Sequence, residues 1–142
     1  MPSAQYTVTV RRSPEDVFAF VADGTTGPRW RSGVLEIALI GGSGAGTRYR
    51  QAMRGPGGRR IEADYEITTY EPPRHLAFQV TAGPVRPHGD YRFEPIGDGT
   101  RVTFSLAAEL GGLKRLIMGS SVQREMDSGV GSLERLKEIL ES

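Results

Sequence analysis

The sequence predicts an α+β domain in which an antiparallel sheet of seven strands is followed by one long C-terminal helix. Short runs of alternating apolar and polar residues, separated by turn clusters, extend over residues 6–106. Apolar residues change to helical spacing over residues 113–140. Helix start and stop signals lie close together in residues 13–30. Because the 142 residues hold no internal repeat, low-complexity tract or linker, we expect one domain, residues 1–142.

A first strand near residue 6 leads into a short helix. Ser13 can accept from the amides of the first helical turn, Pro14 suits the first helical position, and two acidic residues follow. Glycines and a proline within residues 24–28 then end the helix before Trp30, the only tryptophan. The helix is therefore expected to span about ten residues, far fewer than the C-terminal one.

A second strand is expected over residues 34–40, and strands 47–54 and 60–70 form a hairpin through a glycine-rich turn. A register that pairs Met53 with Ile61 makes one face apolar and aromatic and the other ionic. It sets Tyr49 opposite Tyr65, Gln51 opposite Ala63, Arg50 opposite Asp64 and Arg48 opposite Glu66. We interpret the arginines as a solvated face of weak cross-strand ion pairs rather than as an anion or nucleic-acid site.

Three more strands and the long helix complete the pattern. The inner faces of these strands carry Leu76, Phe78 and Val80, then Tyr91 and Phe93, then Val102, Phe104 and Leu106. The helix contains Gly119, Gly129 and Gly131, each of which costs about 1 kcal/mol relative to alanine in a helix interior. Two interpretations stay open: the glycines allow close packing or a kink, or they leave room for a ligand.

Composition excludes several classes of function. The 18 basic and 17 acidic residues nearly cancel, so no overall positive field attracts nucleic acid. The absence of cysteine excludes disulfides, thiolate nucleophiles and cysteine-based metal centres. No apolar segment suggests a signal peptide or membrane insertion, so a cytoplasmic protein is expected. Oligomeric state stays open, a homodimer being one option.

Four segments carry a resemblance to a known family: "SPEDVFAFVAD", "YEPPRHLAF", "GDYRFEPIGDGTRVTF" and "SLERLKEILE". With the order of elements, they resemble the polyketide cyclase/dehydrase-like branch of the START and SRPBCC superfamily, over essentially the whole chain. The resemblance implies a helix-grip fold: a curved antiparallel sheet wraps around the C-terminal helix and encloses a mainly apolar cavity. Two short helices after the first strand, with Trp30, would form a wall or gate of that cavity.

The resemblance and the inner-face parity together give the candidate ligand-binding residues. They are Trp30, Tyr49, Gln51, Met53, Tyr65, Phe78, Tyr91, Phe93, Phe104 and Met126. The large apolar members also fit a simple core. The polar groups of Tyr49, Gln51 and Tyr65 need hydrogen-bond partners in an apolar interior, which either a ligand or an internal network supplies.

No catalytic constellation is evident. The inner face of the sheet offers phenols and an amide but no carboxylate, so the candidates for proton transfer are Tyr65 and Tyr49. His88, at the start of a strand near the loop 83–89, is a third candidate if that loop lines the cavity mouth. His75 follows two prolines and is expected at the surface. No residues have metal-ligand or phosphate-loop spacing, so neither a metal nor a cofactor is expected.

Three hypotheses for function follow. The first is a module that binds a hydrophobic small molecule, such as a lipid, an aromatic polyketide or an isoprenoid, between the sheet and the C-terminal helix. The second is a polyketide cyclase or dehydratase that uses cavity tyrosines. The third is a co-chaperone-like interaction domain, in which the outer face of the sheet binds a protein partner.

Overall fold

The computed structural model describes residues 2–142, except for the side chains at 56 and 113–119. The strands are β1 (Ser3–Val10), β2 (Val34–Gly41), β3 (Arg48–Arg54), β4 (Arg60–Glu62), β5 (Tyr65–Glu71), β6 (His75–Val80), β7 (His88–Ile96) and β8 (Gly99–Ala107). The helices are α1 (Pro14–Ala22), α2 (Gly27–Trp30), α3 (Gly112–Gly131) and α4 (Leu133–Glu141), with short 3-10 turns η1 (Gly24–Thr26) and η2 (Pro56–Gly58).

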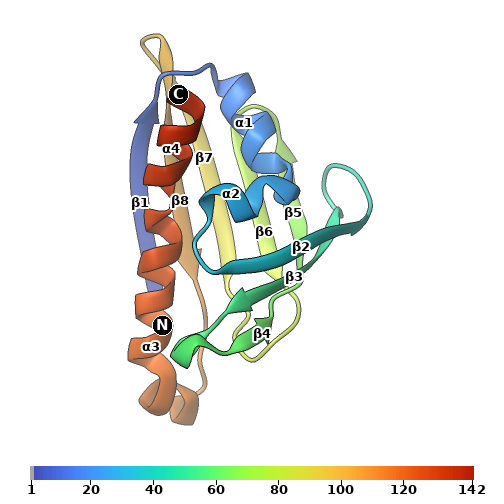
Figure 1. Cartoon of the computed structure of the whole chain (residues 1–142), viewed down its shortest axis with the longest axis vertical. Helices are drawn as coiled ribbons and strands as arrows, with labels where there is room; N and C mark the ends of the chain where they lie inside the picture. The colour runs from blue at the N-terminus through green and yellow to red at the C-terminus, as the bar shows by residue number, and fades with distance from the viewer. Residues whose placement is uncertain (1) are drawn as a thin grey trace.

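The strands form one antiparallel sheet in the order β1-β8-β7-β6-β5-β3-β2, with β4 paired to β3 beside this path. The C-terminal helix runs along β1 and β8, and α1 and α2 lie on the same side of the sheet (Figure 1). This architecture confirms the predicted fold class. The helices cover one face, which is therefore where the interior lies.

The predicted hairpin register is confirmed at both ends. Met53 lies opposite Ile61 and Tyr49 lies opposite Tyr65. Between these pairs the expected single strand is split into β4 and β5, because the Asp64 side chain takes the place of a ladder carbonyl. Its Oδ1 accepts from the Gln51 amide at 3.0 Å.

The arginines of the hairpin do not form the expected cross-strand ion pairs. Arg48 lies opposite Glu66 in the register, but no ion pair joins them among the described side chains. Arg50 and Asp64 likewise make no ion pair in the described part of the chain, since the Asp64 carboxylate is turned toward the backbone. The ion pair that forms in this region joins Arg60 to Glu36 of β2 at 2.6 Å.

Helix α1 begins as predicted. The Ser13 hydroxyl accepts from the Asp16 amide at 3.1 Å, and the helix buries Val17, Phe18 and Val21. The long C-terminal helix is divided at Ser132 into α3 and α4, and both parts pack along β1. The predicted apolar positions at 113–117, and the surroundings of Gly119, lie outside the described side chains.

Candidate ligand-binding cavity

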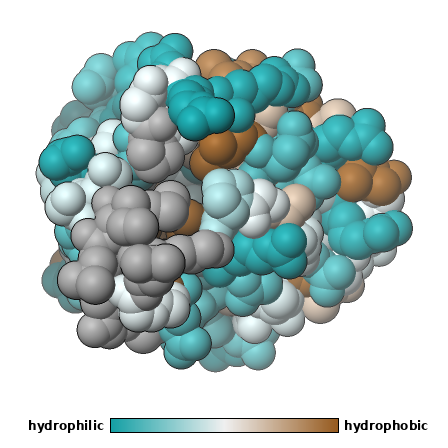
Figure 2. All heavy atoms as spheres, turned by 90° about the horizontal axis from the view of Figure 1, so that it is seen from below, coloured by the Kyte–Doolittle hydropathy of each residue, from teal (hydrophilic) through white to brown (hydrophobic). Residues whose placement is uncertain are grey.

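An apolar cavity of about 140 Å³ lies between α3 and the sheet. Its walls come from β3, β6, β8 and α3: Gln51, Met53, Phe78, Val80, Phe104, Leu106, Val122, Met126 and Gly129. Its rim includes Arg54 and Glu125, which are exposed, and Val85 and Pro87 from the β6–β7 loop. Seen from below, hydrophobic side chains reach this end of the surface only as small areas among hydrophilic ones (Figure 2).

Glycine at position 129 helps to keep the cavity open. A Cβ there would meet Leu106 Cδ1 at 3.3 Å, so any larger side chain must extend into the space that the cavity occupies. Gly131, two residues beyond in the same helix, has no atom within 4 Å of such a Cβ. Of the two interpretations of the helix glycines, Gly129 fits the one in which a missing side chain leaves room.

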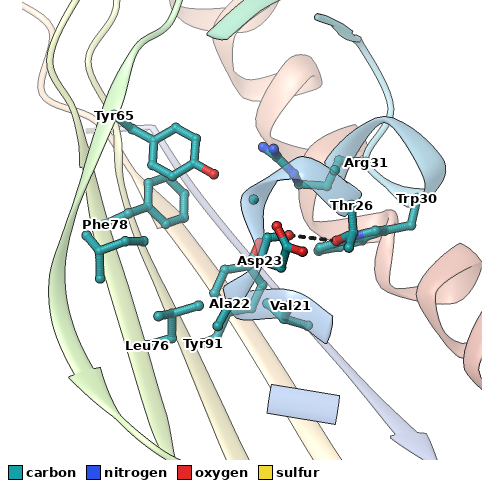
Figure 3. A pocket seen from close by; sticks show the side chains of 13 residues that line it. Val21, Ala22, Asp23, Thr26, Trp30, Arg31, Tyr65, Leu76, Phe78 and Tyr91 are labelled. Atoms are coloured by element: carbon teal, nitrogen blue, oxygen red, sulfur yellow. Dashed lines mark hydrogen bonds between the residues drawn. The ribbon is translucent and has the colours of Figure 1, made fainter. Parts of the chain in front are cut away.

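A second, much smaller pocket of about 20 Å³ lies on the other side of Arg31 and Phe78, which line both spaces. Trp30, Tyr65 and Tyr91 contribute to its walls. In Figure 3 the Arg31 side chain projects from the α2 segment toward the Tyr65 ring. Arg31 and Phe78 thus form a partition between two parts of one interior.

Two of the predicted polar residues are held by internal hydrogen bonds. Tyr49 Oη accepts from the Gly24 amide at 3.1 Å and donates to the Ala22 carbonyl at 3.4 Å, so it anchors the turn after α1. Gln51 is 2% exposed; its Nε2 donates to the Ala63 carbonyl at 3.2 Å and its Oε1 accepts from Arg31 Nη2 at 2.7 Å. For these two side chains the internal-network interpretation applies.

The hydroxyls of Tyr65 and Tyr91 differ from that of Tyr49. Neither makes a hydrogen bond to the described part of the chain, although the two residues are only 7% and 4% exposed. Burial raises the pKa of Tyr65 to about 12, partly offset by the charge of Arg31, and burial raises the pKa of Tyr91 further. Both phenols are therefore protonated at neutral pH and can donate a hydrogen bond.

The structure distributes the predicted ligand-binding residues over three environments. Gln51, Met53, Phe78, Phe104 and Met126 line the larger cavity, and Trp30, Tyr65 and Tyr91 line the smaller pocket with Phe78. Tyr49 and Phe93 line neither; Phe93 is 2% exposed and packs edge-on against Phe18 at 5.2 Å between ring centroids. Trp30 is buried, with Nε1 donating to Thr26 Oγ1 at 3.4 Å, so it is a wall rather than an entrance (Figure 3).

The two histidines lie away from this interior. His88 is exposed at the start of β7 and lines neither pocket, so the structure does not place it where it could move a proton to a bound molecule. The expectation that His75 is a surface residue needs correction. Its side chain is 15% exposed, with Nε2 at 2.5 Å from Asp90 Oδ2 and Nδ1 at 3.5 Å from Glu71 Oε1. The β5–β6–β7 register brings these carboxylates to it.

Sequence reasoning missed the residues that reach the interior from outside the sheet. Arg31 follows α2 directly, Asp23 lines the smaller pocket and Glu125 the larger one. Strand parity cannot find such residues, since none of them lies on a strand. For Arg31 the available signal was its position immediately after the tryptophan assigned to the cavity wall.

The described part of the chain contains neither a cluster of metal-ligating side chains nor a helix that could span a membrane. Within it, no group of three or more metal-ligating His, Asp or Glu side chains occurs. No described helix is both long enough and apolar enough to cross a membrane.

A curved antiparallel sheet that holds a long C-terminal helix, with an apolar cavity between them, is the helix-grip arrangement of START-like proteins. More specifically, the chain belongs to the family described as polyketide cyclase / dehydrase and lipid transport, whose pattern matches residues 1–138. This confirms the family resemblance inferred from the four sequence segments.

Three known proteins are similar to this chain in sequence or in fold. An uncharacterised protein of Mycobacterium tuberculosis is 32% identical over 115 residues, which are 77% of this chain; the match spans 66% of that relative's length. The di-domain ARO/CYC StfQ from the steffimycin biosynthetic pathway has a TM-score of 0.79 at 12% identity, covering 98% of this chain and 50% of its own. A START superfamily protein from Mycobacterium smegmatis has a TM-score of 0.66 at 16% identity, and the match covers 94% of this chain and 98% of that protein. The two structural matches show the fold alone.

Proposed function

We propose that this chain binds a hydrophobic small molecule in the cavity between α3 and the sheet. The observation that carries the proposal is an apolar cavity of about 140 Å³ beside a helix that has glycine, not a larger residue, at position 129. Closely packed cores contain few voids larger than a water molecule. A void of this size, lined by aromatic, aliphatic and thioether side chains, is typical of a site for an apolar ligand.

The size of the cavity limits what fits without rearrangement. A dry apolar cavity of about 150 Å³ accepts a molecule the size of benzene. The present cavity, at about 140 Å³, therefore holds one ring or a short alkyl chain. A lipid, an aromatic polyketide or an isoprenoid needs more room. Movement of the Arg31 and Phe78 partition would join the two spaces and supply part of that room.

A second candidate function is a cyclase or dehydratase reaction, as the family description allows. The specific observation in its favour is the Tyr65 hydroxyl, which lines the smaller pocket and has no hydrogen-bond partner among the described residues. Such a phenol can act as a proton donor to a carbonyl. If this function holds, Tyr65→Phe abolishes turnover of a processed substrate while the substrate still binds.

Thermal unfolding in the presence of a ligand panel tests the binding proposal. The panel contains fatty acids, sterols, flavonoids and aromatic polyketides. A ligand at 100 times its Kd adds about 2.7 kcal/mol to the free energy of unfolding, which raises Tm by several degrees in a domain of this size. We expect such a shift for at least one chemical class.

Two leucine substitutions in the same helix make the test specific. Gly129→Leu fills the cavity, so we expect it to abolish the ligand-induced shift while the protein stays folded. Gly131→Leu is the matched control, because position 131 faces open space. A flat response to the whole panel, or an unchanged shift in Gly129→Leu, would contradict the proposal.

A further inference from the structure

The Arg31 guanidinium has an unusual set of neighbours. It is partly buried, its Nη2 donates to Gln51 Oε1 at 2.7 Å, and its Cζ lies 5.8 Å from the centroid of the Tyr65 ring. No carboxylate lies within ion-pair distance of it in the part of the chain that the structure describes. A partly buried positive charge thus faces a neutral amide and an aromatic ring.

The fold makes room for this side chain. Arg31 ends α2, where its amide donates to the Gly27 carbonyl at 2.7 Å. The guanidinium then folds back over Gly27, where a Cβ would overlap it. The glycine at position 27 and the hydrogen bond to Gln51 together hold the charge between the two pockets.

Leaving such a cation without a counterion is unfavourable. Partial removal from water penalises the charged form, and the penalty is offset only when an opposite charge or several hydrogen bonds replace the solvent. One amide oxygen occupies one of the several N–H donors of a guanidinium. The remaining donors are free to bind an oxygen-rich group.

The neighbouring polar groups are hydrogen-bond donors as well. The hydroxyls of Tyr65 and Tyr91, residues that are 7% and 4% exposed, make no hydrogen bond within the described residues and line the same pocket as Arg31. In Figure 3 the Tyr65 hydroxyl and the Arg31 guanidinium lie on facing sides of this space. The amide of Gln51 is already engaged on both sides.

Two exposed acidic residues, Asp23 and Glu125, border the two pockets, and neither supplies a counterion for Arg31. Asp23 is exposed, and its Oδ1 accepts from the amide and hydroxyl of Thr25 at 3.0 and 2.6 Å. Glu125 is exposed on the rim of the larger cavity. Arg31 makes no ion pair with either of them. The inner end of the cavity therefore has more donors than acceptors and an uncompensated positive charge.

We infer that the natural ligand carries an anionic oxygen group, a carboxylate, which binds Arg31 and the Tyr65 hydroxyl while its apolar body lies under α3. This inference rests on the proposed function and adds the chemical class of the ligand. A neutral carbonyl or hydroxyl would satisfy some of the donors but would leave the charge of Arg31 unpaired. A carboxylate satisfies the free hydrogen-bond donors and also pairs the charge of Arg31, because it accepts several hydrogen bonds and carries the opposite charge.

Matched pairs of probes test the inference on the intact chain. Benzoate is compared with benzyl alcohol and dodecanoate with dodecan-1-ol, each pair sharing its apolar part and differing in charge. Hydrogen bonds to charged groups contribute about 1.5–3 kcal/mol, so we expect each acid to bind roughly 10- to 100-fold more tightly than its alcohol. Binding is measured by NMR titration at neutral pH.

Substitutions locate the effect. Arg31→Gln removes the charge, so we expect it to weaken acid binding by at least about tenfold and alcohol binding by much less, with partial recovery of acid binding in Arg31→Lys. Arg54→Gln is the matched control, because Arg54 is an exposed arginine on the rim of the same cavity. If Arg31→Gln does not fold, two other results test the inference. These are the preference of the unsubstituted chain for acids over alcohols and the acid binding of Arg31→Lys.

The outcomes separate the inference from the function on which it rests. Equal binding of acids and alcohols overturns the anionic ligand and leaves the apolar site standing. Acid preference that Arg31→Gln does not reduce also overturns it, because the anion then binds elsewhere. If no probe binds and the ligand panel gives no thermal shift, both proposals fail.

Discussion

The two halves of the C-terminal helix cover the same sheet in different ways. Under α4 the interior is filled: Leu133, Leu136 and Val10 of β1 are fully buried. Under α3, Val122 and Met126 are also buried, yet a cavity of about 140 Å³ remains beside them. Burial alone therefore does not separate a core from a binding site, because side chains that line a pocket can be largely hidden from solvent as well.

The difference comes from what else covers the sheet. Helix α1 lies at the same end of the sheet as α4, and its Val17, Phe18 and Val21 join α4 and the sheet in one cluster (Figure 1). Phe18 reaches Phe93, with 5.2 Å between ring centroids. No element of this kind packs under α3 among the described residues, where the smaller cluster consists of Ala108, Val122 and Met126.

The largest expected effect contrasts one buried side chain from each half. Leu136→Ala removes a fully buried side chain from the filled end, so we expect a loss of about 3–5 kcal/mol in the free energy of unfolding. Met126→Ala removes a side chain of similar size that already faces a void, so the loss should be about 2 kcal/mol or less. Urea denaturation of both variants measures the difference.

The m-value provides the control for this pair, since a change in slope would indicate an altered unfolded state rather than lost packing. Equal losses for the two variants would show that α3 packs as tightly as α4 in solution. In that case the distinction between a filled half, under α4, and a hollow half, under α3, would be wrong.

The sequence predicts the fold in detail because strand parity and capping are local properties. The alternation of apolar residues and the pairing of Met53 with Ile61 fix which face each strand buries. Ser13 and Pro14 fix where α1 begins. The break at Asp64 was not predictable in this way, because it depends on a side chain reaching the backbone of another strand.

The site is less predictable, since it depends on distances between elements. Phe93 and Phe104 share the same inner face, and parity treats them alike. Phe93 belongs to the core with Phe18, whereas Phe104 lines the cavity. Which of the two contacts a ligand depends on where α1 and α3 sit above the sheet, and residue types do not determine that. The sequence did not predict the position of Arg31 for a related reason. Arg31 follows α2 directly and lies on no strand, so strand parity says nothing about it.

An effect of intermediate size concerns Tyr65, which lines the smaller pocket beside Arg31 and Phe78. The pKa of Tyr65 is raised from 10.0 to about 12 by burial. The unfolded chain therefore ionises first as pH rises, and stability that is complete below pH 10 is lost progressively up to about pH 12. The full loss is at most about 2–3 kcal/mol, at 1.36 kcal/mol per pKa unit.

Chemical denaturation between about pH 8 and pH 12 measures this loss, with Tyr65→Phe as the control that removes it. The difference in tyrosinate absorbance between the unsubstituted chain and Tyr65→Phe isolates the titration of Tyr65 from that of the other four tyrosines. If the phenol titrates near its ordinary value of 10.0 and the variant keeps the full pH dependence, water from the hollow half reaches Tyr65 in the folded protein. The partition formed by Arg31 and Phe78 would then not separate the two spaces from solvent.

The smallest expected effect distinguishes two glycines of α3. Gly131 lies in a helix with no atom within 4 Å of an added Cβ, so Gly131→Ala should raise the free energy of unfolding by up to about 1 kcal/mol through helix propensity. Gly129→Ala gains the same propensity but brings its Cβ to 3.3 Å from Leu106 Cδ1, so its net change should be smaller. Thermal unfolding of both variants tests this order. A larger gain at 129 than at 131 would mean that Leu106 moves freely into the cavity, and the hollow half would then be a soft packing defect rather than a shaped site.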